Sequence, residues 1–197
     1  MLVFWKERFV LLSVPKTGTQ AYVHALAPHA SIVITDPPEL KHAPLYRYNR
    51  FFRPMFEKLG AESMDVVAVI REPIDWLGSW FRYRQRDALN GKPTSTRGVS
   101  FEEFVLASCE DAPPAFANVG SQARFTEPRP NGTSVSHFFQ YENQKAFRSF
   151  LESRLGDVPP VPDMNVSPKL SLSLPQHAQK EVKEKRRADF ELWHSIR

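Results

Sequence analysis

The chain has 197 residues, with 42% hydrophobic residues, 24% charged residues and a formal net charge of +4. This is ordinary globular composition that suits one domain over residues 1–197. The modest positive excess suits an anionic ligand, with weak nucleic-acid or membrane contact as alternatives that the charge does not distinguish. The single cysteine excludes an internal disulfide framework, and no apolar run approaches the ~20 residues of a membrane span, so we expect a cytoplasmic protein without a secretory signal.

The predicted elements alternate between strands and helices. In chain order they are a strand over 9–14, a helix over 19–26, a strand over 31–35, a helix over 47–59, a strand over 65–70, a helix from 73 towards 89, a short helix over 101–107, a strand over 135–140, a helix over 142–155 and a charged helix over 176–196. The run DVVAVI at 65–70 is typical of a parallel strand buried on both faces. We therefore expect an α/β fold with a central parallel sheet flanked by helices, in which ligands bind outside the carboxyl ends of the strands.

The segment between the first strand and the first helix has the composition of a phosphate-binding loop. It reads VPKTGTQ over residues 14–20. Gly18 permits a positive φ, so that neighbouring amides converge at a helix N-terminus, where an anion is favoured. Lys16 adds a positive charge, and the two threonines add hydroxyl donors. The order differs from GxxxxGK[ST] because the lysine precedes the glycine, and a plain turn with a solvated lysine is the alternative.

A second unusual segment, VVAVIREPIDWLGSWFRYR, covers residues 66–84. Arg71 stands at the tip of a buried strand, where a guanidinium is costly unless it pairs, and its planar fork suits a phosphate. Ser79 lies about two helical turns further on and is expected to face the same way. An ordinary ion pair of Arg71 with Glu72 or Asp75 is the alternative. A magnesium-dependent kinase would carry an aspartate at this strand end, so the arginine favours a phosphate clamp without a metal ion.

These motifs together resemble those of the sulfotransferase family. PKTGT resembles that family's 5′-phosphosulfate loop, and VIREPIDWLGSWFRY resembles its 3′-phosphate segment, whose usual form is RxPxxRxxS. The resemblance continues in HFFQYEN at 137–143, FLESRLG at 150–156, NVS at 165–167 and ADFELW at 188–193. Gln20 departs from the small hydroxyl residue common at the end of the loop. Leu77 and Gly78 stand where the family often has Arg and Asp.

The resemblance implies a P-loop-like α/β fold of the sulfotransferase type. It also implies transfer of a sulfuryl group from 3′-phosphoadenosine-5′-phosphosulfate to a hydroxyl or amine. Arg71 and Ser79 would hold the 3′-phosphate, and the 5′-phosphosulfate would be held by Pro15, Lys16, Thr17, Gly18, Thr19 and Gln20. The acceptor (a sugar, a lipid or another small molecule) and the oligomeric state are open. No metal ion and no nucleic-acid partner are expected.

Sulfuryl transfer to a hydroxyl gains from a base that takes the acceptor's proton and a cation that stabilises the leaving phosphate. Lys16 is the candidate cation. His42, in LKHAP over residues 40–44, is the candidate base because it follows the second strand and titrates near neutrality. The segment resembles the KxHxP region of some sulfotransferases, with one residue fewer between lysine and histidine. A structural histidine is the alternative reading, and Glu39 and Asp36 are rival bases.

Two further features are predicted to be ordinary. The acidic neighbours of Cys109 predict a raised thiol pKa and therefore an unreactive cysteine. The basic residues of the last helix predict a solvated face, with docking to an acidic acceptor or a partner as the alternative. Two rival functions remain open, a kinase of small metabolites with a variant phosphate loop and a non-catalytic nucleotide-binding relative.

Overall fold

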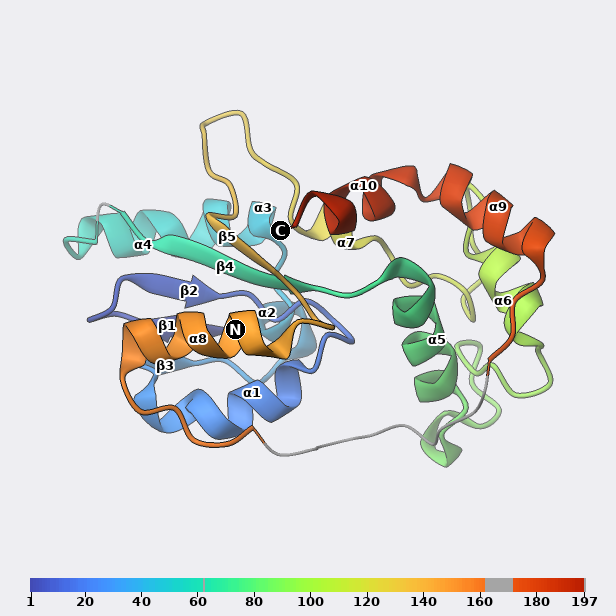
Figure 1. Cartoon of the computed structure of the whole chain (residues 1–197), viewed down its shortest axis with the longest axis horizontal. Coiled ribbons are helices and arrows are strands. Elements are labelled where there is room, and N and C mark those ends of the chain that lie inside the picture. Colours follow the sequence, from blue (N-terminus) through green and yellow to red (C-terminus); the bar gives the residue numbers. More distant parts are fainter. Residues whose placement is uncertain (62, 162–171, 197) are drawn as a thin grey trace. The chain divides into compact units, whose positions relative to one another are not determined.

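The computed structural model describes residues 1–61, 63–161 and 172–196, and contacts within the chain group them into two compact units (Figure 1). The first unit comprises Met1–Arg71, the described residues from 122 to 161, and Ile196. The second comprises Glu72–Ser121 and residues 172–195. A single domain over 1–197 stays a prediction. The NVS segment at 165–167 lies outside the described residues.

The first unit is built on a mixed five-stranded sheet with the strand order β3-β1-β2-β4-β5. Its strands are β1 (Leu2–Phe4), β2 (Phe9–Leu11), β3 (Ile32–Val33), β4 (Asp65–Ile70) and β5 (His137–Gln140). β4 pairs in parallel with β2 and with β5, whereas β1 pairs antiparallel with β2 and with β3. The α/β class with a helix-flanked sheet is confirmed, but the expectation of a wholly parallel sheet is wrong. The P-loop type of the fold stays a prediction.

The antiparallel part of the sheet arises from a tight hairpin at the start of the chain. β1 pairs with β2 in the register Leu2↔Leu11 and Phe4↔Phe9, which leaves four residues for the turn. Arg8 closes this turn with a φ of 56°, in the left-handed region. β1 is a three-residue apolar run that leads directly into the turn, and the first predicted strand covers 9–14, so β1 was not predicted.

One face of the sheet is covered by α1 (Thr19–Leu26) and α8 (Gln144–Leu155). The core between them holds alternate strand residues, helix residues and one residue that follows α8, namely Leu2, Phe4, Phe9, Leu11, Val67, Val69, Tyr22, Ala25, Leu26, Phe147, Leu151 and Val158. Burying each large side chain contributes roughly 1.5–3 kcal/mol. α8 begins where the Asn143 side chain accepts the amide of Ala146, and it ends at Gly156, whose φ is 80°.

The remaining elements of the first unit are short. They are η1 (Ala27–His29), α2 (Pro38–Lys41), α3 (Leu45–Arg47), the π-helical segment η2 (Tyr48–Phe52), α4 (Arg53–Lys58) and α7 (Gln122–Phe125). The helix predicted over 47–59 is thus a helical run from Leu45 to Lys58 with a π-helical middle. Pro54 has no amide to donate and its ring crowds the carbonyl four residues earlier, which accounts for the widened turn that precedes it.

The second unit is helical. Its elements are α5 (Pro73–Arg84), η3 (Asp87–Leu89), α6 (Phe101–Ala107), α9 (Gln176–Lys185) and α10 (Arg187–Ser195). Aromatic residues dominate its core, which includes Trp76, Phe81, Phe101, Phe104 and Phe190. α5 begins where the Glu72 carboxylate accepts the Asp75 amide at 2.7 Å, and a reciprocal capping box of Ser100 and Glu103 begins α6.

The helix predicted over 176–196 is interrupted at Arg186, so that prediction is wrong in its continuity. The Arg186 guanidinium donates to the carbonyl oxygens of Ser108 and Gly120 at 3.2 and 2.5 Å. It also binds the buried carboxylate of Asp189 at 3.0 Å. These tertiary contacts override the local helical pattern. The other basic residues of the run are exposed, as a solvated face requires, but Arg186 is not.

Candidate functional site

The carboxyl ends of three parallel strands meet at one edge of the first unit's sheet. The loop of residues 14–20 follows β2, Arg71 follows β4 directly, and Tyr141 follows β5 directly. Nη1 of Arg71 donates to the carbonyl oxygen of Lys16 at 3.1 Å, and its guanidinium carbon lies 4.4 Å from the centre of the Tyr141 ring. The structure therefore brings together the loop and the arginine that the sequence singled out.

The loop between β2 and α1 has an unusual backbone. Lys16 and Gly18 have φ values of 66° and 74°, both in the left-handed region. For a lysine this conformation costs roughly 1 kcal/mol, and such conformations cluster at functional sites. Thr17 between them is fully buried, and its hydroxyl donates to the Val14 carbonyl oxygen at 2.9 Å. The Thr17 hydroxyl thus helps to hold the loop in shape, and its role towards a nucleotide stays a prediction.

The start of α1 presents unpaired backbone donors. Gly18 is its N-cap, no side chain caps the helix, and its first turn carries no acidic residue. The amides from Thr17 to Gln20 donate no hydrogen bond to any residue that the structure describes. Thr19 is half-buried and Gln20 is exposed, so this end of the helix faces solvent. Such an uncapped N-terminus beside a lysine is suited to an anion.

Tyr141 and Gln122 support this site, and the sequence interpretation assigned neither of them a role. A Cβ at Gly18 would lie 3.0 Å from Cε2 of Tyr141, so the tyrosine ring packs directly against the loop. The candidate phosphate-binding residues of the sequence follow the first and third predicted strands. The same rule points to Tyr141, which directly follows the strand predicted over 135–140. Gln122 sits on α7 and gives no such signal.

Gln122 fixes the main chain at Arg71. Its fully buried amide group donates to the Arg71 carbonyl oxygen at 2.8 Å and accepts the Arg71 amide at 2.9 Å. Both bonds continue the hydrogen bonding of β4 beyond its last residue. The position of the Arg71 backbone is therefore set by α7 as well as by the strand.

His42, the candidate base, directly follows α2. Its Nδ1 lies 2.7 Å from the carbonyl oxygen of Ser13, just before the loop. A carbonyl oxygen only accepts, so Nδ1 carries the proton and Nε2 of the neutral ring is an acceptor. Burial lowers the pKa of His42 below its usual 6.5, and the positive charges of Lys41 and Lys16 lower it further, against the opposing effect of the Ser13 bond. A neutral imidazole is the form that can accept a proton.

The rival bases lie in a different setting. Glu39 and Asp36 are both exposed, and neither makes a side-chain hydrogen bond or ion pair with a residue that the structure describes. His42 is the one of the three candidates with a defined bond to the segment that leads into the loop. This geometry favours His42.

Ser79 is buried on α5, in the second unit, so its role at the 3′-phosphate stays a prediction. The alternative of an ion pair between Arg71 and Glu72 or Asp75 stays open, and both carboxylates also make contacts within α5 and its N-terminus. Glu72 accepts the Asp75 amide, and the Asp75 carboxylate lies 3.6 Å from Nη2 of Arg82.

The thiol pKa of Cys109 is raised, as predicted, but the cause differs from the predicted one. The pKa of its thiol is raised chiefly because the side chain is half-buried, while Glu181 adds a smaller increase. The acidic neighbours in the sequence are therefore not the main reason. A raised thiol pKa leaves little thiolate at neutral pH.

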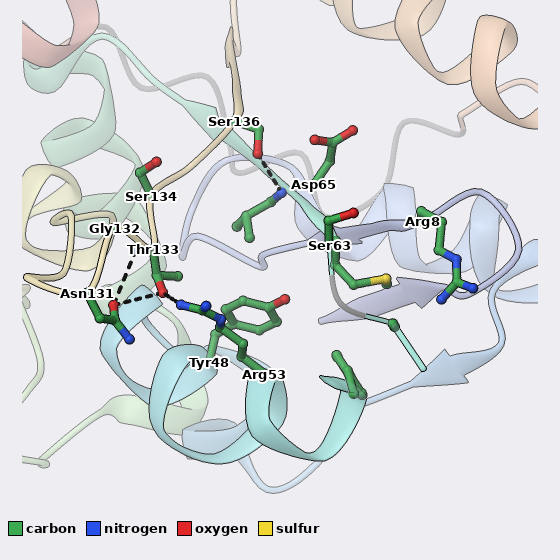
Figure 2. A pocket seen from close by; sticks show the side chains of 14 residues that line it. Arg8, Tyr48, Arg53, Ser63, Asp65, Asn131, Gly132, Thr133, Ser134 and Ser136 are labelled. Atoms are coloured by element: carbon green, nitrogen blue, oxygen red, sulfur yellow. Dashed lines mark hydrogen bonds between the residues drawn. The ribbon is translucent and has the colours of Figure 1, made fainter. Parts of the chain in front are cut away.

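A hollow of about 400 Å³ lies where β4 begins, at the end of this strand opposite to Arg71 (Figure 2). Hydroxyl groups of Tyr48, Ser63, Ser134 and Ser136 are among its lining groups. The Tyr48 side chain is 2% exposed, its hydroxyl faces the hollow without a partner among the described residues, and burial raises the pKa of this phenol to about 12. Polar groups make up most of the lining of this hollow.

No group of three His, Cys, Asp or Glu side chains in the described ranges is arranged to hold a metal ion. No helix there is both long and apolar enough to cross a bilayer. Comparisons of the chain with protein-family models, with curated proteins and with solved structures found no match. The family resemblance therefore rests on the motifs alone.

Proposed function

We propose that the chain transfers a sulfuryl group from 3′-phosphoadenosine-5′-phosphosulfate to a hydroxyl or amine of a small acceptor. The observation that carries the proposal is the contact between the uncapped loop of residues 14–20 and Arg71 at the end of the neighbouring parallel strand. Two cations, and a row of amides that donate to no described residue, lie at the carboxyl ends of the parallel strands and suit a ligand with more than one anionic group. A strand end that carries arginine in place of aspartate favours this ligand over a magnesium nucleotide.

The proposed chemistry uses the side chains as follows. The acceptor oxygen forms a bond to sulfur as the bond between sulfur and the bridging oxygen breaks, and adenosine 3′,5′-bisphosphate leaves. Nε2 of His42 takes the acceptor's proton, which requires the neutral ring that its buried setting favours. Lys16 and the amides of the loop stabilise the negative charge that develops on the leaving phosphate.

Isothermal titration calorimetry tests the nucleotide. Adenosine 3′,5′-bisphosphate should bind without a metal ion and more tightly than ATP with magnesium. Arg71→Ala should weaken this binding by about 10- to 150-fold, since a charge-assisted hydrogen bond contributes roughly 1.5–3 kcal/mol. Arg97→Ala, which removes an exposed arginine paired with Asp87, is the control and should leave the affinity unchanged.

The other outcomes separate the rival functions. Tighter binding of ATP that depends on magnesium would replace the proposal with a kinase. Binding of the bisphosphate without consumption of the phosphosulfate, either by an acceptor panel or by water, would indicate a non-catalytic nucleotide-binding protein. Equal affinities of the Arg71→Ala and native proteins would remove Arg71 from the site.

A further inference from the structure

The large apolar side chains that remain exposed in the described ranges are concentrated in one part of the chain. They are Val33, Leu40, Tyr46, Phe51, Met55 and Leu59. Four of them lie between Tyr46 and Leu59, on the helical run of α3, η2 and α4 and the residue that follows it. Phe51 and Leu59 are 57% and 67% exposed, which is high for side chains of this size. A concentration of this kind marks an interaction surface.

The helical run has an inner and an outer side. Tyr48, Phe52 and Phe56 are spaced by four residues, and the ring of Phe56 contacts the rings of Tyr48, Phe52 and Trp5. Phe51, Met55 and Leu59 have the same spacing with a different phase, and all three are exposed. Residues four apart share one side of a helix, so these three form an outward apolar stripe.

Basic side chains accompany this stripe. Arg50 and Lys58 are exposed, and the guanidinium of Arg50 lies 5.3 Å from the centre of the Phe51 ring. The guanidinium of Arg47 lies 5.7 Å from the centre of the Tyr46 ring. Glu57 is the one acidic residue between positions 45 and 60, and Nε of Arg53 holds its carboxylate at 2.6 Å. We call the exposed set of Tyr46, Arg50, Phe51, Met55, Lys58 and Leu59 the Phe51 face.

An apolar stripe suits either a second copy of the chain or a lipid surface. The charges of the Phe51 face distinguish between these two occupants. A symmetric pair of copies would bring Arg50 and Lys58 of one copy towards the same residues of the other, and such like-charge contacts are unfavourable. An anionic lipid surface meets both requirements, because basic side chains reach the headgroups while apolar side chains enter the boundary of the acyl chains.

We propose that the Phe51 face docks the protein reversibly on an anionic lipid surface. The helical run would lie in the plane of the interface with Phe51, Met55 and Leu59 towards the acyl chains. This role is independent of the nucleotide loop and requires no spanning helix. It would hold the protein where acceptors with a lipid component are concentrated.

Vesicle flotation with the whole chain tests the proposal. The protein should float with vesicles of phosphatidylcholine and phosphatidylserine, not with phosphatidylcholine alone, and added salt should reduce binding. Arg50→Gln with Lys58→Gln should weaken binding by about fivefold for each charge removed. Phe51→Ser with Met55→Ser and Leu59→Ser should weaken it by about tenfold or more. Lys183→Gln with Lys185→Gln, which removes two exposed charges on α9, is the matched control and should bind as the native chain does.

Three outcomes would overturn the proposal. The first is vesicle binding as strong as that of the native chain by both the charge variant and the apolar triple variant. The second is an equal loss in the α9 control, which would mean that net charge alone attracts the protein. The third is a dimer of the native chain in light scattering that the apolar triple variant abolishes, without vesicle binding, which would make the face a contact between copies. An unchanged thermal midpoint of each variant shows that a lost signal is not unfolding.

Discussion

Two constraints restrict position 18 of the candidate site to glycine. Its φ is 74°, and a Cβ there would contact the ring of Tyr141. Gly18→Ala should lower the free energy of unfolding by about 1–2 kcal/mol through the backbone conformation. It should also weaken nucleotide binding, because the new Cβ displaces the Tyr141 ring that packs on Arg71. Urea unfolding and calorimetry measure the two effects.

Gly91→Ala is the matched control for Gly18→Ala. Its φ is 71°, and a Cβ there would meet nothing within 4 Å. It should therefore show the backbone cost alone and leave nucleotide affinity unchanged. Native nucleotide affinity in Gly18→Ala would mean that the Tyr141 ring does not position Arg71.

Substitution of His42 tests whether the role of this residue is catalytic or structural. His42→Gln should lower turnover by about 10²–10⁴-fold, because a base acts in the transition state. The affinity for adenosine 3′,5′-bisphosphate should hardly change, since a base contacts the acceptor. Slow hydrolysis of the phosphosulfate serves as the assay without an acceptor. Unchanged turnover in a folded variant would transfer the role to Glu39 or Asp36.

The lowered pKa of His42 also has a consequence for stability. Below pH 6.5 the unfolded chain protonates this histidine more readily than the folded chain does, so the free energy of unfolding falls as the pH falls through that region. His42→Gln should make thermal midpoints less sensitive to pH between about 6.5 and the lower folded pKa. An identical slope in the native and His42→Gln proteins would contradict the buried setting of His42.

At the scale of elements, the sequence predicts best where one local signal agrees with burial. β4 and α6 have the predicted bounds, since a run of apolar residues marks the first and a capping box marks the second. β1 is only three residues long, and its pairing with β2 and β3 makes the sheet mixed. The loop and Arg71 were predictable because both follow predicted strands, whereas Gln122 reaches Arg71 across 51 positions and leaves no local pattern.

The break between α9 and α10 follows from a buried ion pair. Arg186→Ala removes its bonds to the Ser108 and Gly120 carbonyl oxygens and its pair with Asp189, whose carboxylate is buried. Loss of one partner of a buried pair costs about 3–5 kcal/mol, so the urea midpoint should fall strongly. Arg187→Ala, at the exposed neighbouring position, should change the free energy of unfolding by less than about 0.5 kcal/mol. Similar urea midpoints for the two variants would mean that the side-chain contacts of Arg186 do not cause the break between α9 and α10.

At the scale of the whole molecule, connectivity bears on whether the two units unfold together. β4 ends at Ile70 and α5 begins at Pro73, so two residues connect a strand of the first unit to a helix of the second. The chain then returns to the first unit at Gln122. No long linker separates the units at these crossings, which favours a single cooperative transition. We expect amides of β4 and α6 to lose protection at one urea concentration in hydrogen-exchange mass spectrometry.

The nucleotide provides a sharper form of this test, because Lys16 and Arg71 both belong to the first unit. A ligand at 100 times its dissociation constant stabilises the folded state by about 2.7 kcal/mol. If the units unfold together, adenosine 3′,5′-bisphosphate should raise the urea midpoint of the α6 amides as much as that of the β4 amides. A rise confined to β4 would divide the chain into two domains. Arg71→Ala should remove the shift from both elements, which ties the effect to the proposed site.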